Sequence, residues 1–164
     1  MKSQIGDPAA AARAHEALFG YWASLRRGPR LPSRADLDPG AFKRLLPAVS
    51  LIDVDRHGVE FRLRLAGTGL YDIYGFEITG RSFGEIYSLS AADYWRGELD
   101  KVVSEGRPAV GVHNLAWRAA SHLSLFWLRL PLASDGHRVD MILGYDALVR
   151  TGHRAPQPEA AQAA

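Results

Sequence analysis

The sequence predicts an α+β fold, in which one antiparallel sheet of five strands carries helices on one face and an extra helix precedes the sheet. Three observations support this. Apolar Phe61, Leu63 and Leu65 alternate with Arg62 and Arg64, the pattern of a strand with one buried face. Glycines recur between residues 67 and 80, so the next segment is broken into turns and short helices. One long amphipathic helix and three further strand-like segments then complete the order.

The composition is that of a single globular domain. The chain has 164 residues, of which 47% are hydrophobic and 23% charged. No apolar run approaches the roughly 20 residues of a membrane-spanning helix, and the N-terminus lacks the apolar core of a secretory signal, so we expect a cytoplasmic protein. The net charge of +2 is too small to predict nucleic-acid binding, although Arg26, Arg27, Arg30 and Arg34 lie close together.

Several kinds of chemistry are not expected. The chain has no cysteine, which excludes disulfides, thiolate nucleophiles and cysteine-bound metals. Among the six histidines only His113 and His122 fall within predicted strands, and the expected pairing does not make them neighbours, so we predict no metal site. Because no motif for a serine hydrolase, a zinc protease or a phosphate-binding loop is present, we predict that the protein is not an enzyme.

The N-terminal part divides into two regions. Residues 1–12 are rich in alanine and are predicted to be flexible, while residues 13–47 form a helical extension and a loop. The helix, expected over residues 12–27, carries one apolar stripe made of Leu18, Tyr21, Trp22 and Leu25. This stripe covers either its own sheet or a second subunit, and both alternatives stay open.

The loop over residues 31–39 contains a charged group and leads into a short helix at residues 39–46. Arg34 with Asp36 and Asp38 is read either as a charged site or, as we prefer, as an Arg–carboxylate pair that pins the loop. Asp38 followed by Pro39 is typical of a helix start.

The remaining elements form the core at residues 48–150. Strands are predicted at residues 48–55, 59–66, 109–117, 122–132 and 138–149, and helices at residues 70–74, 82–87 and 90–105. Tight turns are expected at residues 56–58, 118–121 and 135–136. Residues 151–164 are rich in proline and alanine and are predicted to be a disordered tail.

Aromatic residues are the best candidates for a ligand site. A sheet flanked by such helices leaves room for a cavity, and tyrosine and tryptophan combine an apolar body with a polar tip. The simpler interpretation, which we prefer, is that the same residues fill the core of the domain. If a cavity exists, the predicted ligand-binding residues are Tyr71, Tyr74, Phe83, Tyr87, Trp95, His113, Trp127 and Tyr145. On the outer face, Glu60, Arg62 and Arg64 form either a docking patch for an acidic partner or, more simply, a solvated strand face.

Two segments of the sequence resemble a known family. Gly67-Thr68, Tyr71 and the run from Thr79 to Ile86, TGRSFGEI, resemble the centre of a PAS domain. The loop with Pro32, Arg34 and Pro39 resembles the small stand-alone bacterial proteins of PAS family 5, and the similarity spans roughly residues 18–149.

The resemblance implies a sensor or interaction module of bacterial signal transduction. Such a module binds a small ligand or a signalling protein and, without an output domain of its own, transmits by contact. Helices that precede a PAS core often mediate dimerisation, which implies a homodimer. Flavin and cinnamoyl photoreceptors of this fold need a cysteine, which is absent. Haem is disfavoured because residues 90–105 contain no histidine, although His113 could ligate from a strand, and the cofactor stays unknown.

The alternative is a small α+β enzyme or carrier with a conical, aromatic-lined cavity. This alternative predicts a titratable pair deep in the cavity, His113 with Asp53 or with Asp146.

Overall fold

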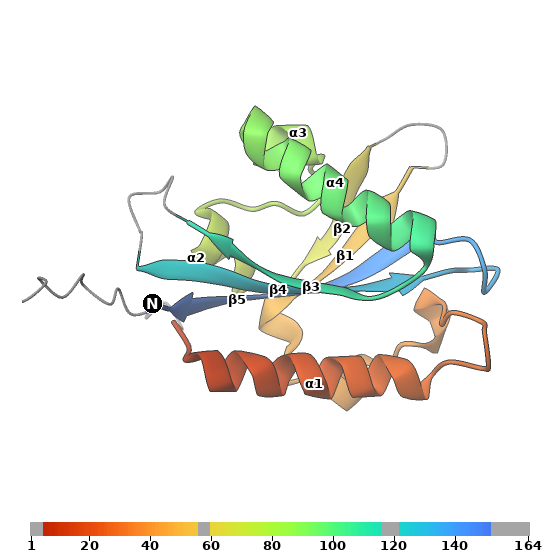
Figure 1. Cartoon of the computed structure of the whole chain (residues 1–164). Helices are drawn as coiled ribbons and strands as arrows, with labels where there is room; N and C mark the ends of the chain where they lie inside the picture. The colour runs from red at the N-terminus through yellow and green to blue at the C-terminus, as the bar shows by residue number, and fades with distance from the viewer. Residues whose placement is uncertain (1–4, 56–59, 116–121, 152–164) are drawn as a thin grey trace, which may run out of the picture.

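The protein folds as one antiparallel sheet with helices on both sides (Figure 1). The computed structural model describes residues 5–55, 60–115 and 122–151. Its strands are β1 (Val49–Val54), β2 (Phe61–Ala66), β3 (Ala109–Asn114), β4 (Leu123–Leu132) and β5 (Met141–Arg150). They lie in the order β2-β1-β5-β4-β3, with every neighbouring pair antiparallel. The predicted five-stranded α+β fold is confirmed.

The helix α1 (Pro8–Ser24) covers one face of the sheet. It starts earlier than residue 12, because Asp7 caps it by accepting a hydrogen bond from the Ala10 amide at 2.8 Å and Pro8 occupies the first turn. Residues 8–12, which the sequence assigned to the segment before the helix, lie within α1. Gly6 also bonds to β5, donating to the Leu148 carbonyl at 3.0 Å. The sequence left open whether the apolar stripe of α1 covers its own sheet or a second subunit. In this structure Leu18 and Trp22, two residues of the stripe, are buried against the chain's own sheet.

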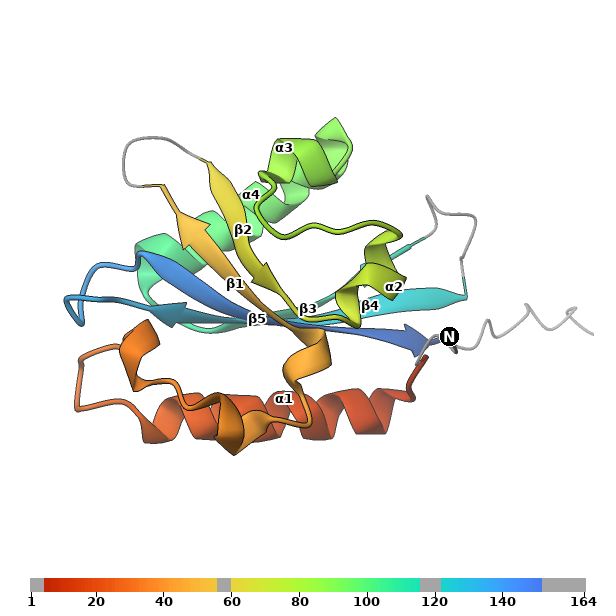
Figure 2. The same ribbon diagram turned by 180° about the vertical axis from the view of Figure 1, so that it is seen from behind.

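Three short 3-10 helices lie beside α1 on the same side of the sheet (Figure 2). They are η1 (Arg34–Asp36), η2 (Pro39–Phe42) and η3 (Leu46–Ala48), where one helix over residues 39–46 was expected. The preferred Arg–carboxylate pair is absent from the described residues of this loop. Asp36 instead accepts hydrogen bonds from the amide and hydroxyl of Ser33, at 2.8 and 2.9 Å, and so closes the first turn of η1 itself.

The opposite face carries the helices α2 (Leu70–Tyr74), α3 (Phe83–Ile86) and α4 (Leu89–Glu105), here called the helical flap. Ser82 and Glu85 form a capping box at the start of α3, and Gly106, at a φ of 59°, ends α4. Both features follow sequence signals. No helix in residues 5–55, 60–115 or 122–151 is long and apolar enough to span a membrane.

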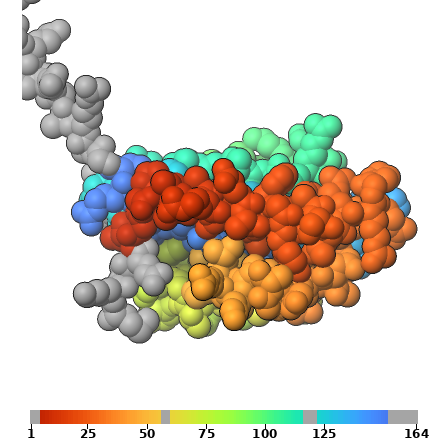
Figure 3. Space-filling model, turned by 90° about the horizontal axis from the view of Figure 1, so that it is seen from below, coloured from red at the N-terminus to blue at the C-terminus, as the bar shows by residue number. Residues whose placement is uncertain are grey.

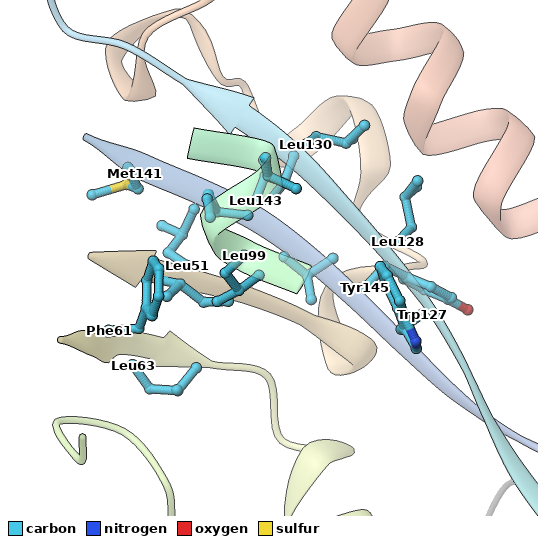
Figure 4. Packing of buried hydrophobic residues seen from close by; sticks show 14 of the residues in the cluster. Leu51, Phe61, Leu63, Leu99, Trp127, Leu128, Leu130, Met141, Leu143 and Tyr145 are labelled. Atoms are coloured by element: carbon cyan, nitrogen blue, oxygen red, sulfur yellow. The ribbon is translucent and has the colours of Figure 1, made fainter. Parts of the chain in front are cut away.

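The central strands are buried on both faces, so the core has two layers. Figure 4 shows Leu128 and Leu130 on the side of β4 that faces α1, whereas Trp127 points to the other side. The layer under α1 is built around Leu18 and Trp22, and the layer under the flap around Phe83, Trp95, Leu99 and Trp127. The predicted turns at residues 56–58 and 118–121 lie outside the described residues, as does the tail beyond Thr151.

On the outer face of β2 the charged residues bind their own neighbourhood. Arg64 forms an ion pair with Asp53 on the adjacent strand, at 2.9 Å. Arg62 donates to the Gly80 carbonyl at 2.7 Å. This arrangement corresponds to the simpler interpretation of the pattern, a solvated strand face tied to its surroundings.

Candidate functional site

A buried ion pair lies between the sheet and the helical flap. Arg129 on β4 and Asp146 on β5 are 2% and 3% exposed. The Arg129 Nη2 donates to Asp146 Oδ1 at 2.9 Å, and its Nη1 donates to the carbonyls of Leu128 and Tyr145 at 2.9 and 3.3 Å. Two full charges in an apolar interior persist only when paired and hydrogen-bonded in this way.

The strand register brings these two side chains together. Asp146 pairs with Trp127 and Arg129 pairs with Gly144, so all four residues share one face of the sheet. Gly144 is required at its position, because a Cβ there would overlap the Ser50 hydroxyl and approach Arg129 Nη1 to 3.3 Å. The glycine therefore leaves the space in which the guanidinium lies.

Two tryptophans enclose the guanidinium group. The Arg129 Cζ lies 4.9 Å from the Trp95 ring centroid and 5.7 Å from that of Trp127, within the range of cation–π attraction. Trp95 comes from α4 and meets Trp127 edge-on at 5.4 Å. Gly111 on β3 lets the Trp127 indole lie flat on the sheet, since a Cβ at residue 111 would stand 2.5 Å from that ring. The flap is thus held on the sheet through a charged group.

A pair of tyrosines extends this polar cluster into the flap. The hydroxyls of Tyr74, in α2, and Tyr87, just after α3, lie 2.9 Å apart. Burial raises the pKa of Tyr74 well above its usual range, and the Asp146 carboxylate acts in the same direction. Burial likewise raises the pKa of Asp146, opposed by the charge of Arg129 and its hydrogen bond. We call Arg129, Asp146, Tyr74, Tyr87 and Trp95 the polar cluster.

A small cavity lies between the flap and the sheet beside this cluster. Its volume is about 20 Å³, roughly the space of one water molecule. The cavity is lined almost entirely by apolar atoms, from Ile73, Tyr74, Tyr87, Ala91, Trp95, His113, Leu115 and Leu125. In this packing the site is therefore nearly filled by the protein's own side chains.

The predicted ligand-binding residues fall into three groups. Tyr74, Tyr87, Trp95 and His113 line the cavity. Phe83 and Trp127 support them from behind, with ring centroids 5.2 Å from Tyr87 and 5.4 Å from Trp95. Tyr71 and Tyr145 lie elsewhere: Tyr71 is 53% exposed on the surface, and Tyr145 is on the α1 side of the sheet, 5.5 Å from the His15 ring.

The predicted interface residues also have positions in this structure. Trp22 donates its indole N–H to the Pro131 carbonyl at 2.9 Å, and Leu18 is fully buried. Tyr21 packs on Phe42 at 5.2 Å and Leu25 is half-buried. Because the chain's own sheet and loop cover most of this stripe, a second subunit would have to contact other residues of α1.

Sequence reasoning missed Arg129 as a site residue. The signal was present, because a single arginine interrupts the apolar run from Leu123 to Leu132. A charge inside a strand that is apolar on both sides needs a buried partner. Asp146 was considered only as a partner of His113, and Asp53 as its alternative. Asp146 instead pairs with Arg129, and Asp53 pairs with Arg64 at the surface.

Two half-buried histidines, His15 and His113, lead us to expect that folding stability falls on acidification. Burial lowers the pKa of His15 and of His113 below 6.5. As the pH falls through about 6.5, these histidines bind protons in the unfolded chain before they do so in the folded protein. The free energy of unfolding therefore decreases as the pH falls from about 6.5 toward the lower pKa of the folded state.

We expect the urea midpoint to drop between pH 7.5 and 5.5, and to drop less in His15→Gln and His113→Gln. The exposed His122→Gln serves as the matched control. An equal pH dependence in all four proteins would contradict the assignment.

Within the described residues no group of three or more histidine, aspartate or glutamate side chains could hold a metal ion.

Comparison with known proteins gives a family and several structural neighbours, two of which are described here. The model of PAS family 5, described as a PAS domain, matches residues 10–147. A solved PAS domain of a protein from Colwellia psychrerythraea is 11% identical, with a TM-score of 0.46, over 65% of this chain and 92% of that one. An RNA-binding light-oxygen-voltage receptor is 17% identical, with a TM-score of 0.41, over 68% of this chain and 33% of that one. No curated protein matches the sequence.

Proposed function

Because this chain belongs to the PAS domain family, whose members are typically sensory and non-enzymatic, we propose that it is a cytoplasmic sensor and interaction module of bacterial signal transduction. A change at the polar cluster shifts the packing of the helical flap on the sheet, and a partner protein detects that shift by contact. We infer no catalytic activity of its own.

The observation that carries this proposal is the buried polar cluster itself. Replacing a buried ion pair with apolar side chains of similar volume often leaves the free energy of unfolding unchanged. We therefore infer that the two charges serve to select one specific packing of the flap on the sheet. The cluster joins five elements: β4, β5 and the first part of α4 on one side, and α2 and the end of α3 on the other. The short helices α2 and α3 are the parts best placed to repack.

Two unpartnered donors indicate what kind of ligand would fit. Arg129 Nε and Trp127 Nε1 are buried and have no hydrogen-bond partner among the described residues. Arg129 and Asp146 together carry no net charge. A small, largely apolar ligand with a hydrogen-bond acceptor would therefore suit the site, entering as α2 and α3 move away from Trp95.

Native mass spectrometry of the purified full chain, with an absorbance spectrum, tests the occupancy of the site. We expect extra mass on the folded species, and we expect the variant Tyr87→Trp, which narrows the cavity, to lose it. Tyr71→Trp, at an exposed position on α2, is the matched control and keeps the extra mass. If the folded protein carries no extra mass, or if Tyr87→Trp retains it in full, the ligand part of the proposal is wrong.

A further inference from the structure

An apolar strip lies uncovered along one flank of α1. Val110 and Val112 on the edge strand β3 are 64% and 56% exposed. They pair with Leu128 and Phe126 on β4, and therefore point to the face that α1 covers. Figure 3 shows that α1 leaves the teal segment containing β3 open on one flank, whereas residues 34–48 lie along the other.

Phe19 belongs to the same strip. It is 45% exposed and contacts Trp22, with ring centroids 5.9 Å apart. Successive residues of a helix turn by about 100°, so Phe19 and Tyr21 lie on opposite flanks of the sheet-facing stripe. Tyr21 packs on Phe42 of η2, which leaves Phe19 on the flank of β3. The apolar strip is made of Phe19, Val110, Val112 and the half-buried Phe126.

The strip leads into a cationic cleft. Arg26 follows the end of α1 and lies over the Trp22 ring, the same ring that Phe19 contacts, and Arg107 lies two residues before the start of β3. Both line a cleft of about 280 Å³ with His137, and Glu105 is the single carboxylate among its lining residues in the described chain. Neither arginine forms an ion pair with a carboxylate of the described residues. Arg26 instead lies over the Trp22 ring at 5.4 Å, and donates to the Pro29 carbonyl at 3.4 Å.

Neighbouring charges do not neutralise the cleft. Arg30 donates to the backbone carbonyl of Asp135 at 3.0 Å. The Asp135 Oδ1 accepts from the amides of His137 and Arg138 at 2.8 and 2.7 Å, which holds it in the turn. Elsewhere in the described chain, Arg62, Arg64, Arg96 and Arg129 each have a carboxylate within 4.0 Å. The guanidiniums of Arg26 and Arg107 therefore keep their charge available for a partner.

We propose that the apolar strip and the cationic cleft together bind an amphipathic segment of a partner protein, with its apolar side chains on Phe19, Val110 and Val112 and its carboxylates on Arg26 and Arg107. This inference rests on the proposed function, because it identifies the surface through which the module makes contact. Complementary charge would fix the register of the segment, and the apolar strip would supply burial. A second copy of the chain fits less well, since it would bring the same arginines and one carboxylate, Glu105, to the cleft.

The test uses the full chain and a fluorescein-labelled peptide of twelve residues, with leucines on one face and three consecutive glutamates at one end. We expect Val110→Thr/Val112→Thr to weaken binding about tenfold and Arg26→Glu/Arg107→Glu to weaken it at least tenfold. Arg13→Glu/Arg44→Glu, at exposed positions away from the cleft, is the charge-matched control and stays within about twofold of wild type. NMR shifts on adding the peptide should concentrate at Phe19, Val110 and Val112.

Four results would overturn the inference. They are equal binding by all variants, shifts confined to other residues, displacement of the peptide by duplex DNA as readily as by polyglutamate, and a wild-type dimer that Val112→Glu converts to a monomer. Native mass spectrometry of the cavity does not depend on this strip. If the cavity holds a ligand but the peptide does not bind, the docking site is refuted and the proposed sensor function stands. If the peptide binds but the cavity holds no ligand, only the proposal of a bound ligand is refuted.

Discussion

Replacing Asp146 with asparagine is expected to lower the free energy of unfolding by about 3–5 kcal/mol, because the Arg129 charge is then buried without a counter-charge. The guanidinium is 2% exposed and cannot reach water without moving Trp95. Urea denaturation at pH 7 measures the loss. The matched control is Asp53→Asn, which removes the carboxylate of the exposed pair with Arg64 and should cost far less, because solvent screens that pair.

The double variant Arg129→Met/Asp146→Leu separates stability from specificity. Replacing both charges with apolar groups of similar size should restore stability to within about 1–2 kcal/mol of wild type. We expect this variant to fold and yet to lose the ligand-dependent change in the flap. If Asp146→Asn proves no more damaging than Asp53→Asn, the ion pair does not contribute as described.

Trp95→Ala is expected to cost about 3–5 kcal/mol, the range for a fully buried tryptophan. Trp95 is 1% exposed and contacts Tyr87, Trp127, Arg129 and His113, so its removal opens a cavity and uncovers the charge. Thermal or urea unfolding measures the change. Tyr94→Ala, one residue earlier on α4 and only half-buried, should cost clearly less. Equal losses for the two variants would show that α4 is held generally, not through Trp95.

Much of the fold could be predicted because its signals are local. The alternation correctly predicted that Phe61 and Leu63 are buried on one face of β2, whereas Leu65, expected on the same face, is 43% exposed. The glycines after the strand marked where the chain breaks into α2 and α3. The apolar stripe of α1 likewise showed which side of the helix is buried. The earlier start at Pro8 had a local signal too, Asp7 followed by proline, which the alanine-rich composition obscured.

The site was harder to predict because it depends on contacts between distant residues. The strands β4 and β5 are buried on both faces, so alternation cannot tell which side chains face the flap. Tyr145 was therefore assigned to the cavity although it faces α1, and the next residue, Asp146, is the one on the flap side of the sheet. Whether the aromatic residues fill the core or line a cavity depends on packing volumes that no sequence pattern encodes.

Native-state hydrogen exchange measured by mass spectrometry tests the central claim most directly, because the proposed sensor needs a flap that repacks while the sheet persists. We predict that amides of α2 and α3 exchange through local opening at a lower free energy than amides of β4 and β5. The double variant Arg129→Met/Asp146→Leu should change the exchange of the flap and leave that of the sheet unaltered. Exchange of flap and sheet together, only by global unfolding and unaffected by the variant, would contradict a flap with two packings.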